Sequence, residues 1–341
     1  MEFDLSQRAN LVTLQEFADK IMILQNQVGF KQSARGWCYQ LESERLINKN
    51  QFDKVESWIN KCRKRGVLPI DFLQEEGRQF SGVEDPTEET PMEHMRGWVE
   101  AVLHTEDYYT PDWWKGEKFY IQMLVEKIDL KTLFSPVCEK YHIPIATSKG
   151  WSSMLQRATY ARRFKEAEDQ GLRPVLLYCG DHDPDGLRIS EFIRSNLADL
   201  SEIEWEDYTS GYDPEGLEIV RFGLNSDFIE KHNLTWIDNL ITGGKKHLDL
   251  SDKSHRNHYM DYVQNYLKTY GVKKCEANAI VPMPKIAREL VEGTIIDFLG
   301  VDAVKRFDKK TNAIRRKVKA FRKKVGLDKA LQNAIELIDK G

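Results

Sequence analysis

The chain has 341 residues, of which 41% are hydrophobic and 30% are charged, so it is long enough for two domains and a sizeable buried core. Its formal net charge of −4 does not by itself indicate a nucleic-acid partner, and no apolar run reaches the roughly 18 residues that a membrane-spanning helix needs. Five scattered cysteines without a Cys-x-x-Cys pair and a polar, acidic N-terminus favour a cytoplasmic protein with reduced thiols over a secreted, disulfide-bonded or zinc-binding one.

The first part of the chain is predicted to be helical. Residues 11–28 repeat apolar side chains at helical spacing, and residues 33–47 and 52–65 follow the same pattern. Short turns separate these segments, which is typical of a small helix-turn-helix or winged-helix unit. We therefore predict a winged-helix-like domain over residues 1–105.

Strands and helices alternate in the second part, residues 106–341. Buried, strand-like runs occupy residues 119–127, 142–148 and 173–181, with amphipathic helices between them. Apolar strands separated by helices are the mark of a parallel sheet that is covered on both faces, so an α/β fold is expected. A further strand near 217–225 and helices near 260–270, 283–298 and 303–338 are predicted to complete this domain as a helical extension.

Acidic residues follow two of the predicted strands at the point where each strand ends. Glu126 comes after the first strand, and Asp181, Asp183 and Asp185 alternate along a tight turn after the third. Ligand sites in parallel sheets form outside the carboxyl ends of the strands. Carboxylates crowded at one edge repel each other unless a cation neutralises them, and oxygen ligands suit Mg²⁺. The sequence therefore predicts a magnesium site built from these four acids.

The same acids allow two other interpretations. The pattern Asp-x-Asp-x-Asp-Gly also opens a calcium-binding EF-hand loop, but position 12 of such a loop would be Phe192 instead of the required Glu. The acids could instead cap the helix that follows, since Asp is favoured at helix N-termini. Capping accounts for one Asp more readily than for three together with a Glu at a neighbouring strand end, so a metal site is favoured.

A Glu at one strand end followed by Asp-x-Asp-x-x-Gly at another resembles the Toprim domain of topoisomerases and primases. With Pro184, the loop looks most like the form in the topoisomerase VI A subunit and the meiotic double-strand-break protein, although Asp185 stands where an aromatic is usual. Lys149-Gly150-Trp151 resembles a Lys-Gly segment of that family. The segment from Cys275 to Ile280 is similar to its Glu-x-Asp-Ala-Leu segment, with Asn278 in place of the Asp.

The same family carries a nucleophilic tyrosine in an Arg-x-x-(aromatic)-Tyr pattern, which Arg35-Gly36-Trp37-Cys38-Tyr39 resembles with Cys38 in place of the aromatic. A helix here would bury a stripe that includes Trp37 and Leu41, and would place Arg35 and Tyr39 one turn apart on another face. The guanidinium could then grip a phosphate and favour the tyrosinate. A tyrosine four residues after an arginine is common in a chain with thirteen tyrosines, so this assignment depends on the resemblance.

The resemblance implies a Mg²⁺-dependent cleavage of double-stranded DNA in which Tyr39 forms a 5′-phosphotyrosyl link, with Glu126 also counted as catalytic. It implies a homodimer in which one subunit's tyrosine meets the other's metal site, an association with the nucleoid, and no membrane. The segment 243–246 lacks P-loop spacing, so strand passage would need a separate ATPase B-type subunit.

Basic residues are expected to hold the DNA backbone, although like-charge blocks are also common on solvated helix faces. Eleven Lys or Arg gather in residues 305–324 against a single acid, and a shorter basic run lies near residue 63. The residues assigned to DNA binding are Arg35, Lys61, Arg63, Lys64, Arg65, Lys149, Arg315, Arg316 and Lys317.

Two alternative functions stay open at this stage. A Toprim nuclease would hydrolyse DNA with metal-bound water and leave Tyr39 a structural role. A non-catalytic DNA-binding accessory protein would bind in a salt-dependent manner without cleavage. His182, inside the acidic loop, is expected to face solvent more readily than to contact phosphate.

Overall fold

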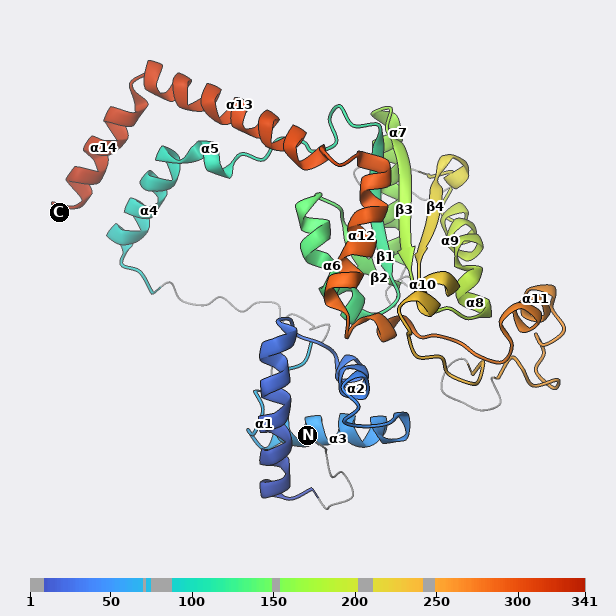
Figure 1. The fold of residues 1–341 in the computed structure, drawn as a ribbon. Coiled ribbons are helices and arrows are strands. Elements are labelled where there is room, and N and C mark those ends of the chain that lie inside the picture. Colours follow the sequence, from blue (N-terminus) through green and yellow to red (C-terminus); the bar gives the residue numbers. More distant parts are fainter. Residues whose placement is uncertain are drawn as a thin grey trace. The chain divides into compact units, whose positions relative to one another are not determined.

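The structure is a computed structural model that describes residues 9–69, 72–74, 88–148, 154–201, 211–241 and 249–340. The chain forms two compact units, each built from two separate segments (Figure 1). The first unit combines residues 1–76 with 118–298, and the second combines 77–117 with 299–341. The predicted domain boundary at residues 105 and 106 therefore lies within the second unit.

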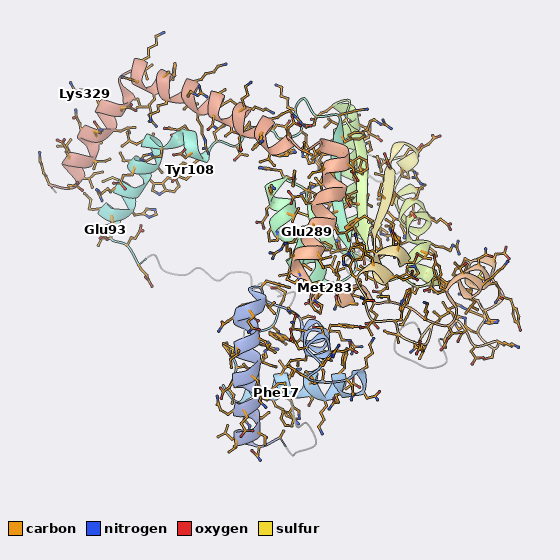
Figure 2. All side chains as sticks on the ribbon, viewed as in Figure 1. Phe17, Glu93, Tyr108, Met283, Glu289 and Lys329 are labelled. Carbon is orange, nitrogen blue, oxygen red and sulfur yellow. The ribbon has the colours of Figure 1, made fainter. Side chains whose placement is uncertain are left out.

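The N-terminal segment of the first unit is a module of helices, as predicted. Helix α1 spans Leu11–Val28 and begins at Asn10, whose side chain accepts a hydrogen bond from the Thr13 N–H at 3.0 Å. Helix α2 (Ala34–Ser43), the short 3₁₀ helix η1 (Lys49–Gln51) and α3 (Phe52–Lys64) follow. Their apolar faces pack into one core that includes Phe17 of α1, labelled in Figure 2. No strand is described between residues 9 and 69, so the winged-helix assignment stays a prediction.

The rest of the first unit is built on a parallel sheet, which confirms the expected α/β class. Its strands are β1 (Phe119–Val125), β2 (Ile145–Thr147), β3 (Arg173–Cys179) and β4 (Glu218–Gly223). They pair in the order β2-β1-β3-β4, and all three pairings are parallel. The interior of β1 and β3 is fully buried, as expected for strands covered on both faces.

Helices cover both faces of this sheet (Figure 1). Phe298 of α12 packs edge-on against Phe119, whereas Phe164 of α7 packs against Tyr120, the next residue of β1. Because neighbouring residues of a strand point to opposite faces, α12 and α7 lie on opposite sides. The helices of this part are α6 (Ile128–Lys140), α7 (Met154–Asp169), α8 (Pro184–Leu187), α9 (Ile189–Ala198), η3 (Pro214–Gly216), α10 (Ser226–Lys231), α11 (Asp261–Tyr270), η5 (Ala277–Ile280) and α12 (Pro284–Leu299).

The second unit consists of four helices in its described part: α4 (Pro91–Leu103), α5 (Thr105–Tyr108), α13 (Ala303–Lys324) and α14 (Leu327–Ile338). The predicted helical stretch over 303–338 is interrupted at Gly326, whose φ of 72° lies in the left-handed region that ends a helix. A buried ion pair at 2.6 Å joins Arg322 of α13 to Glu106 of α5. None of the helices in the described ranges is long and apolar enough to cross a lipid bilayer.

Candidate functional site

The acids that follow β1 and β3 meet at one edge of the sheet. The two strands pair in parallel with Val125 opposite Cys179, so the residues after them emerge side by side. Glu126 Oε2 accepts a hydrogen bond from the Asp181 N–H at 2.7 Å. The structure thus brings together Glu126 and Asp181, whose residue numbers differ by 55.

Lys127 lies between these two carboxylates. Its Nζ is 2.7 Å from Glu126 Oε1 and 3.0 Å from Asp181 Oδ2. Burial would lower the pKa of Lys127, but the charges of Asp181 and Glu126 outweigh it and raise that pKa. Sequence reasoning missed Lys127, although its place directly after Glu126 at a strand end was a usable signal.

The electrostatics of the pair differ between its two acids. Burial alone would raise the pKa of Glu126, but Lys127 and the Asp181 N–H outweigh it and hold the pKa below its ordinary value. Burial and the neighbouring Glu126 charge raise the pKa of Asp181 to about 7. Glu126 is therefore the carboxylate that stays ionised over the wider pH range, while Asp181 depends on a cation to hold its charge.

The other two acids of the loop each make a separate contact. Asp183 caps the short helix α8, because its Oδ1 accepts a hydrogen bond from the Gly186 N–H at 2.6 Å. Asp185 Oδ1 accepts a hydrogen bond from the Tyr262 hydroxyl at 3.1 Å. Helix capping, one of the two other interpretations of these acids, thus applies to Asp183.

The carboxylate oxygens of Glu126 and Asp181 are suitable ligands for a hard cation. Carboxylate oxygens are the ligands that Mg²⁺ prefers, and the Lys127 ammonium shows that positive charge is accommodated between Glu126 and Asp181. Among the residues that the structure describes, no three Asp, Glu, His or Cys side chains come together in a group that could hold a metal ion. The magnesium site therefore remains a prediction.

Two residues fix the shape of the acidic loop. A Cβ added at Gly180 would lie 2.4 Å from the Tyr178 hydroxyl oxygen and 2.7 Å from Glu126 Oε2, so a side chain has no room there. Arg221 of β4 donates hydrogen bonds from its guanidinium to the backbone carbonyls of Gly180, Asp181 and Gly186 at 2.9–3.3 Å. Sequence reasoning missed Arg221, which no motif distinguishes from other strand residues.

The expectation that His182 faces solvent is wrong. His182 is 1% exposed, and its Nδ1 lies 3.0 Å from the Tyr266 hydroxyl oxygen. Its backbone exchanges two hydrogen bonds with Cys275, which turn the ring inward against the rings of Trp236 and Tyr270. Burial lowers the pKa of His182 to about 4, so the ring is neutral near pH 7.

The predicted nucleophile, Tyr39, lies in α2 and is 2% exposed. Trp37 and Leu41 are buried as predicted. Tyr39, on another face of the helix, is buried as well, and its hydroxyl donates a hydrogen bond to the Glu276 carboxylate. The next residue, Ala277, donates its N–H to Asp181 Oδ1 at 2.6 Å. The tyrosine and the acidic pair are therefore linked through two consecutive residues.

Charged groups surround the tyrosine. Arg35, one helical turn before Tyr39, lies with its Cζ 6.0 Å from the Tyr39 ring centre and 4.8 Å from that of Phe52, and its Nη1 is 3.5 Å from Glu56 Oε1. Burial and the Glu276 charge raise the pKa of Tyr39 strongly, so the hydroxyl keeps its proton in this arrangement. Glu276 belongs to the segment from Cys275 to Ile280, to which the sequence assigns no role.

A second contact holds α2 in place. The backbone N–H and the hydroxyl of Ser33, the residue before α2, both donate hydrogen bonds to the carboxylate of Asp129 in α6. Asn278 of η5 donates its Nδ2 hydrogen to the same carboxylate at 3.0 Å. A Cβ added at Gly36 would lie 2.9 Å from Asp129 Cγ, so α2 approaches this acid closely. Nothing in the sequence predicted this contact.

The residues assigned to DNA binding fall in both compact units. Lys61, Lys64 and Arg65 are exposed at the end of α3 in the first unit. In α13 of the second unit, Arg316 and Lys317 are exposed, whereas Arg315 is half-buried with its Nε 3.9 Å from Asp107 Oδ1. Arg63, beside the first group, donates a hydrogen bond to the Asn60 side chain. Two further segments, 149–151 with Lys149 and 243–246, lie outside the described residues.

No protein-family model matches this chain, and no curated protein or solved structure matches it either. The resemblance to Toprim proteins therefore depends on the motif residues of the sequence.

Proposed function

We propose that this chain cleaves DNA in a Mg²⁺-dependent reaction with Tyr39 as the nucleophile, in the manner of the type IIB topoisomerase A subunits. The observation that carries the proposal is a set of three hydrogen bonds that are joined through covalent bonds of the chain. It runs from the Tyr39 hydroxyl to Glu276, from Ala277 to Asp181, and from Asp181 to Glu126. The placement of Glu126 and Asp181 after neighbouring parallel strands supports a Toprim domain. A winged-helix domain before it is part of the proposal.

In this reaction the Tyr39 oxygen attacks a DNA phosphorus, the bond from phosphorus to the 3′ oxygen breaks, and a 5′-phosphotyrosyl link forms. Glu126, Asp181 and Asp183 would hold Mg²⁺, which offsets negative charge on the phosphate and on the leaving oxygen. Arg35 lies one turn from Tyr39, where a guanidinium can pair with phosphate. Asp185 would assist through a water molecule or as a further ligand.

The proposal extends to partners. Two chains acting on opposite strands would make a double-strand break, so a homodimer on double-stranded DNA is proposed, associated with the nucleoid. The exposed basic residues of α3 and α13 would hold the DNA backbone without reading bases. A separate ATPase subunit of the B type would be needed for strand passage.

The test is a cleavage assay on supercoiled plasmid with Mg²⁺ or Mn²⁺, stopped with SDS and analysed with and without proteinase K. We expect broken DNA that enters the gel only after proteolysis, and we expect Tyr39→Phe to abolish this protein–DNA adduct. Tyr141→Phe is the matched control, because Tyr141 also donates a hydrogen bond from its hydroxyl to a glutamate, Glu292, in the same unit. Adduct formation that survives in Tyr39→Phe would rule out the nucleophile.

A second candidate, a hydrolytic nuclease, is favoured by one observation. Tyr39 is buried and burial raises its pKa, which disfavours the tyrosinate. This alternative predicts breaks with free 5′-phosphate ends that are indifferent to protease and that persist in Tyr39→Phe. An absence of breaks together with salt-dependent binding would instead indicate a non-catalytic DNA-binding protein.

A further inference from the structure

The contact between Tyr39 and Glu276 joins residues whose numbers differ by 237. The Tyr39 ring is enclosed, with the Phe52 ring edge-on at 5.2 Å and Lys49 Nζ 5.6 Å from its centre. The hydroxyl, in contrast, reaches a carboxylate whose side chain is 19% exposed. The reacting oxygen therefore lies next to a partly exposed carboxylate, although Tyr39 as a whole residue is 2% exposed.

The position of Glu276 is fixed independently of Tyr39. The preceding residue, Cys275, exchanges two backbone hydrogen bonds with His182, and the following residue, Ala277, donates its N–H to Asp181. Lys274 Nζ is 4.0 Å from Glu276 Oε1 and is itself held by the Ile241 carbonyl at 2.6 Å. Glu276 is thus a preorganised acceptor beside the acidic loop.

The charge state of Glu276 suits this role. Burial alone would raise its pKa, but the Tyr39 O–H and the charges of Lys274 and Arg35 outweigh it and hold the pKa below its ordinary value. The carboxylate is therefore ionised near pH 7, so it can accept the Tyr39 O–H.

We propose that Glu276 is a catalytic residue that accepts the phenolic proton of Tyr39 of its own chain as the tyrosine attacks a phosphodiester. The inference rests on the proposed function and adds a residue to it. It also differs from the expected arrangement, in which one subunit's tyrosine meets the other subunit's acids. The Tyr39 hydroxyl here contacts the glutamate that adjoins the acidic loop of the same chain.

Proton transfer accompanies the attack on phosphorus. The phenolic proton passes to the Glu276 carboxylate, the Tyr39 oxygen bonds to phosphorus, and the bond from phosphorus to the 3′ oxygen breaks. The 3′ alkoxide takes a proton from water, and the hydroxide so formed takes the proton from Glu276. Resealing runs the same steps in reverse. General acid–base assistance of this kind contributes about 10²–10⁴-fold to rate.

The experiment measures the rate of adduct formation on a plasmid for the wild type, Glu276→Gln and Glu276→Asp. Glutamine keeps an oxygen that accepts the Tyr39 O–H but cannot take its proton, so the fold is retained while the rate falls about 100-fold. Aspartate keeps the acid and shortens its reach, so an intermediate rate is expected. Glu292→Gln is the matched control, since Glu292 also accepts a tyrosine O–H, and it should leave the rate unchanged.

A second substrate distinguishes a role of Glu276 on the nucleophile from a role on the leaving group. In DNA with sulfur replacing the bridging 3′ oxygen, the leaving group is a thiolate that needs no proton. If Glu276 acts on the nucleophile, Glu276→Gln stays about 100-fold slower than wild type on this substrate too. A return to the wild-type rate would place Glu276 on the leaving group and overturn the assignment.

The outcomes separate the inference from the function on which it rests. No adduct from the wild type overturns the proposed function and the inference with it. An adduct that Tyr39→Phe abolishes but Glu276→Gln forms at the wild-type rate overturns the inference alone. Thermal unfolding of Glu276→Gln, compared with that of Glu292→Gln, shows whether a slow rate reflects a damaged fold. If the fold is damaged, the rate of Glu276→Asp decides whether the inference holds. A rate for Glu276→Asp no higher than that of Glu276→Gln, with a wild-type melting temperature, would also overturn it.

Mixed chains test whether the proton transfer stays within one chain. Tyr39→Phe and Glu276→Gln chains carrying different tags are co-expressed and purified on both tags in succession. An adduct level no higher than that of either variant alone supports transfer within one chain, as does a failure of the chains to pair at all. Restoration toward half the wild-type level means that Glu276 serves the partner's tyrosine, which overturns this part of the inference.

Discussion

At the scale of single residues, Lys127 provides the positive charge that both acids of the site contact. Its ammonium is within 3.0 Å of both Glu126 and Asp181, so one positive charge compensates two carboxylates at the sheet edge. Removing a partner from such a group leaves uncompensated charge in a partly buried place, which costs more than the loss of a surface ion pair. The acidic pair therefore depends on either this side chain or a bound cation.

We expect Lys127→Met to lower the stability of the metal-free protein by about 1–2 kcal/mol, because the two carboxylates then repel each other without a counter-charge. Mg²⁺ should restore more stability to this variant than it adds to the wild type, since it then binds two carboxylates that no ammonium group neutralises. Thermal unfolding with and without Mg²⁺ measures both effects.

Lys140→Met is the control for Lys127→Met, because Lys140 pairs with a single glutamate, Glu292, nearer the surface. Its removal should cost well under about 1 kcal/mol and leave the response to Mg²⁺ unchanged. Equal Mg²⁺ responses in the wild type and Lys127→Met would contradict the idea that a cation and the ammonium share one place.

At the scale of elements, α2 is held at its N-terminus by an acid from another part of the chain. Asp129 of α6 accepts hydrogen bonds from Ser33 and Asn278, and it also places a carboxylate at the positive end of the α2 dipole. The helix that carries Tyr39 is thus held at two points, through Asp129 at its start and through Glu276 near its middle.

Asp129→Asn should destabilise the first unit by about 2 kcal/mol, because the amide turns an N–H₂ group toward hydrogen-bond donors and removes the charge at the helix N-terminus. Urea unfolding measures the change. The control is Asp53→Asn in the first turn of α3, an exposed acid whose replacement should cost under about 0.5 kcal/mol. Equal midpoints for the two variants would show that Asp129 does not anchor α2.

The elements also show how far the sequence could predict this molecule. The apolar runs of β1 and β3 and the acids directly after them were local signals, so the strands and the meeting of Glu126 with Asp181 followed from pattern and parallel pairing. The partner of Tyr39 was not local. Periodicity indicates which face of a helix is apolar, but it does not indicate that the opposite face is covered by a segment more than 200 residues away. The prediction that His182 faces solvent was wrong for the same reason, since the orientation of this residue is set by its pairing with Cys275.

At the scale of the whole molecule, all five cysteines are buried and none forms a disulfide. Burial raises the pKa of Cys138 and Cys179 to about 12 and that of Cys62 to about 11. A thiol reacts through its thiolate, so both access and charge state protect these side chains in the folded protein.

We therefore expect no thiol to react with a water-soluble disulfide reagent at pH 8 in the native protein, and all five to react after denaturation. The absorbance of the released thiolate measures this. Ala313→Cys, at an exposed position of α13, should add a single fast-reacting thiol and thereby show that the reagent is active. Rapid modification of native cysteines would mean that the core opens readily.

The route of the chain has a consequence for dissecting the molecule. Because each compact unit is made of two separate segments, the chain passes between the units three times, near residues 76, 117 and 298. A truncation after Phe298 would remove α13 and α14 yet leave α4 and α5 attached, with Glu106 deprived of Arg322. The second unit can be isolated only by joining its two segments with an artificial linker, and the first only by closing the gap between residues 76 and 118.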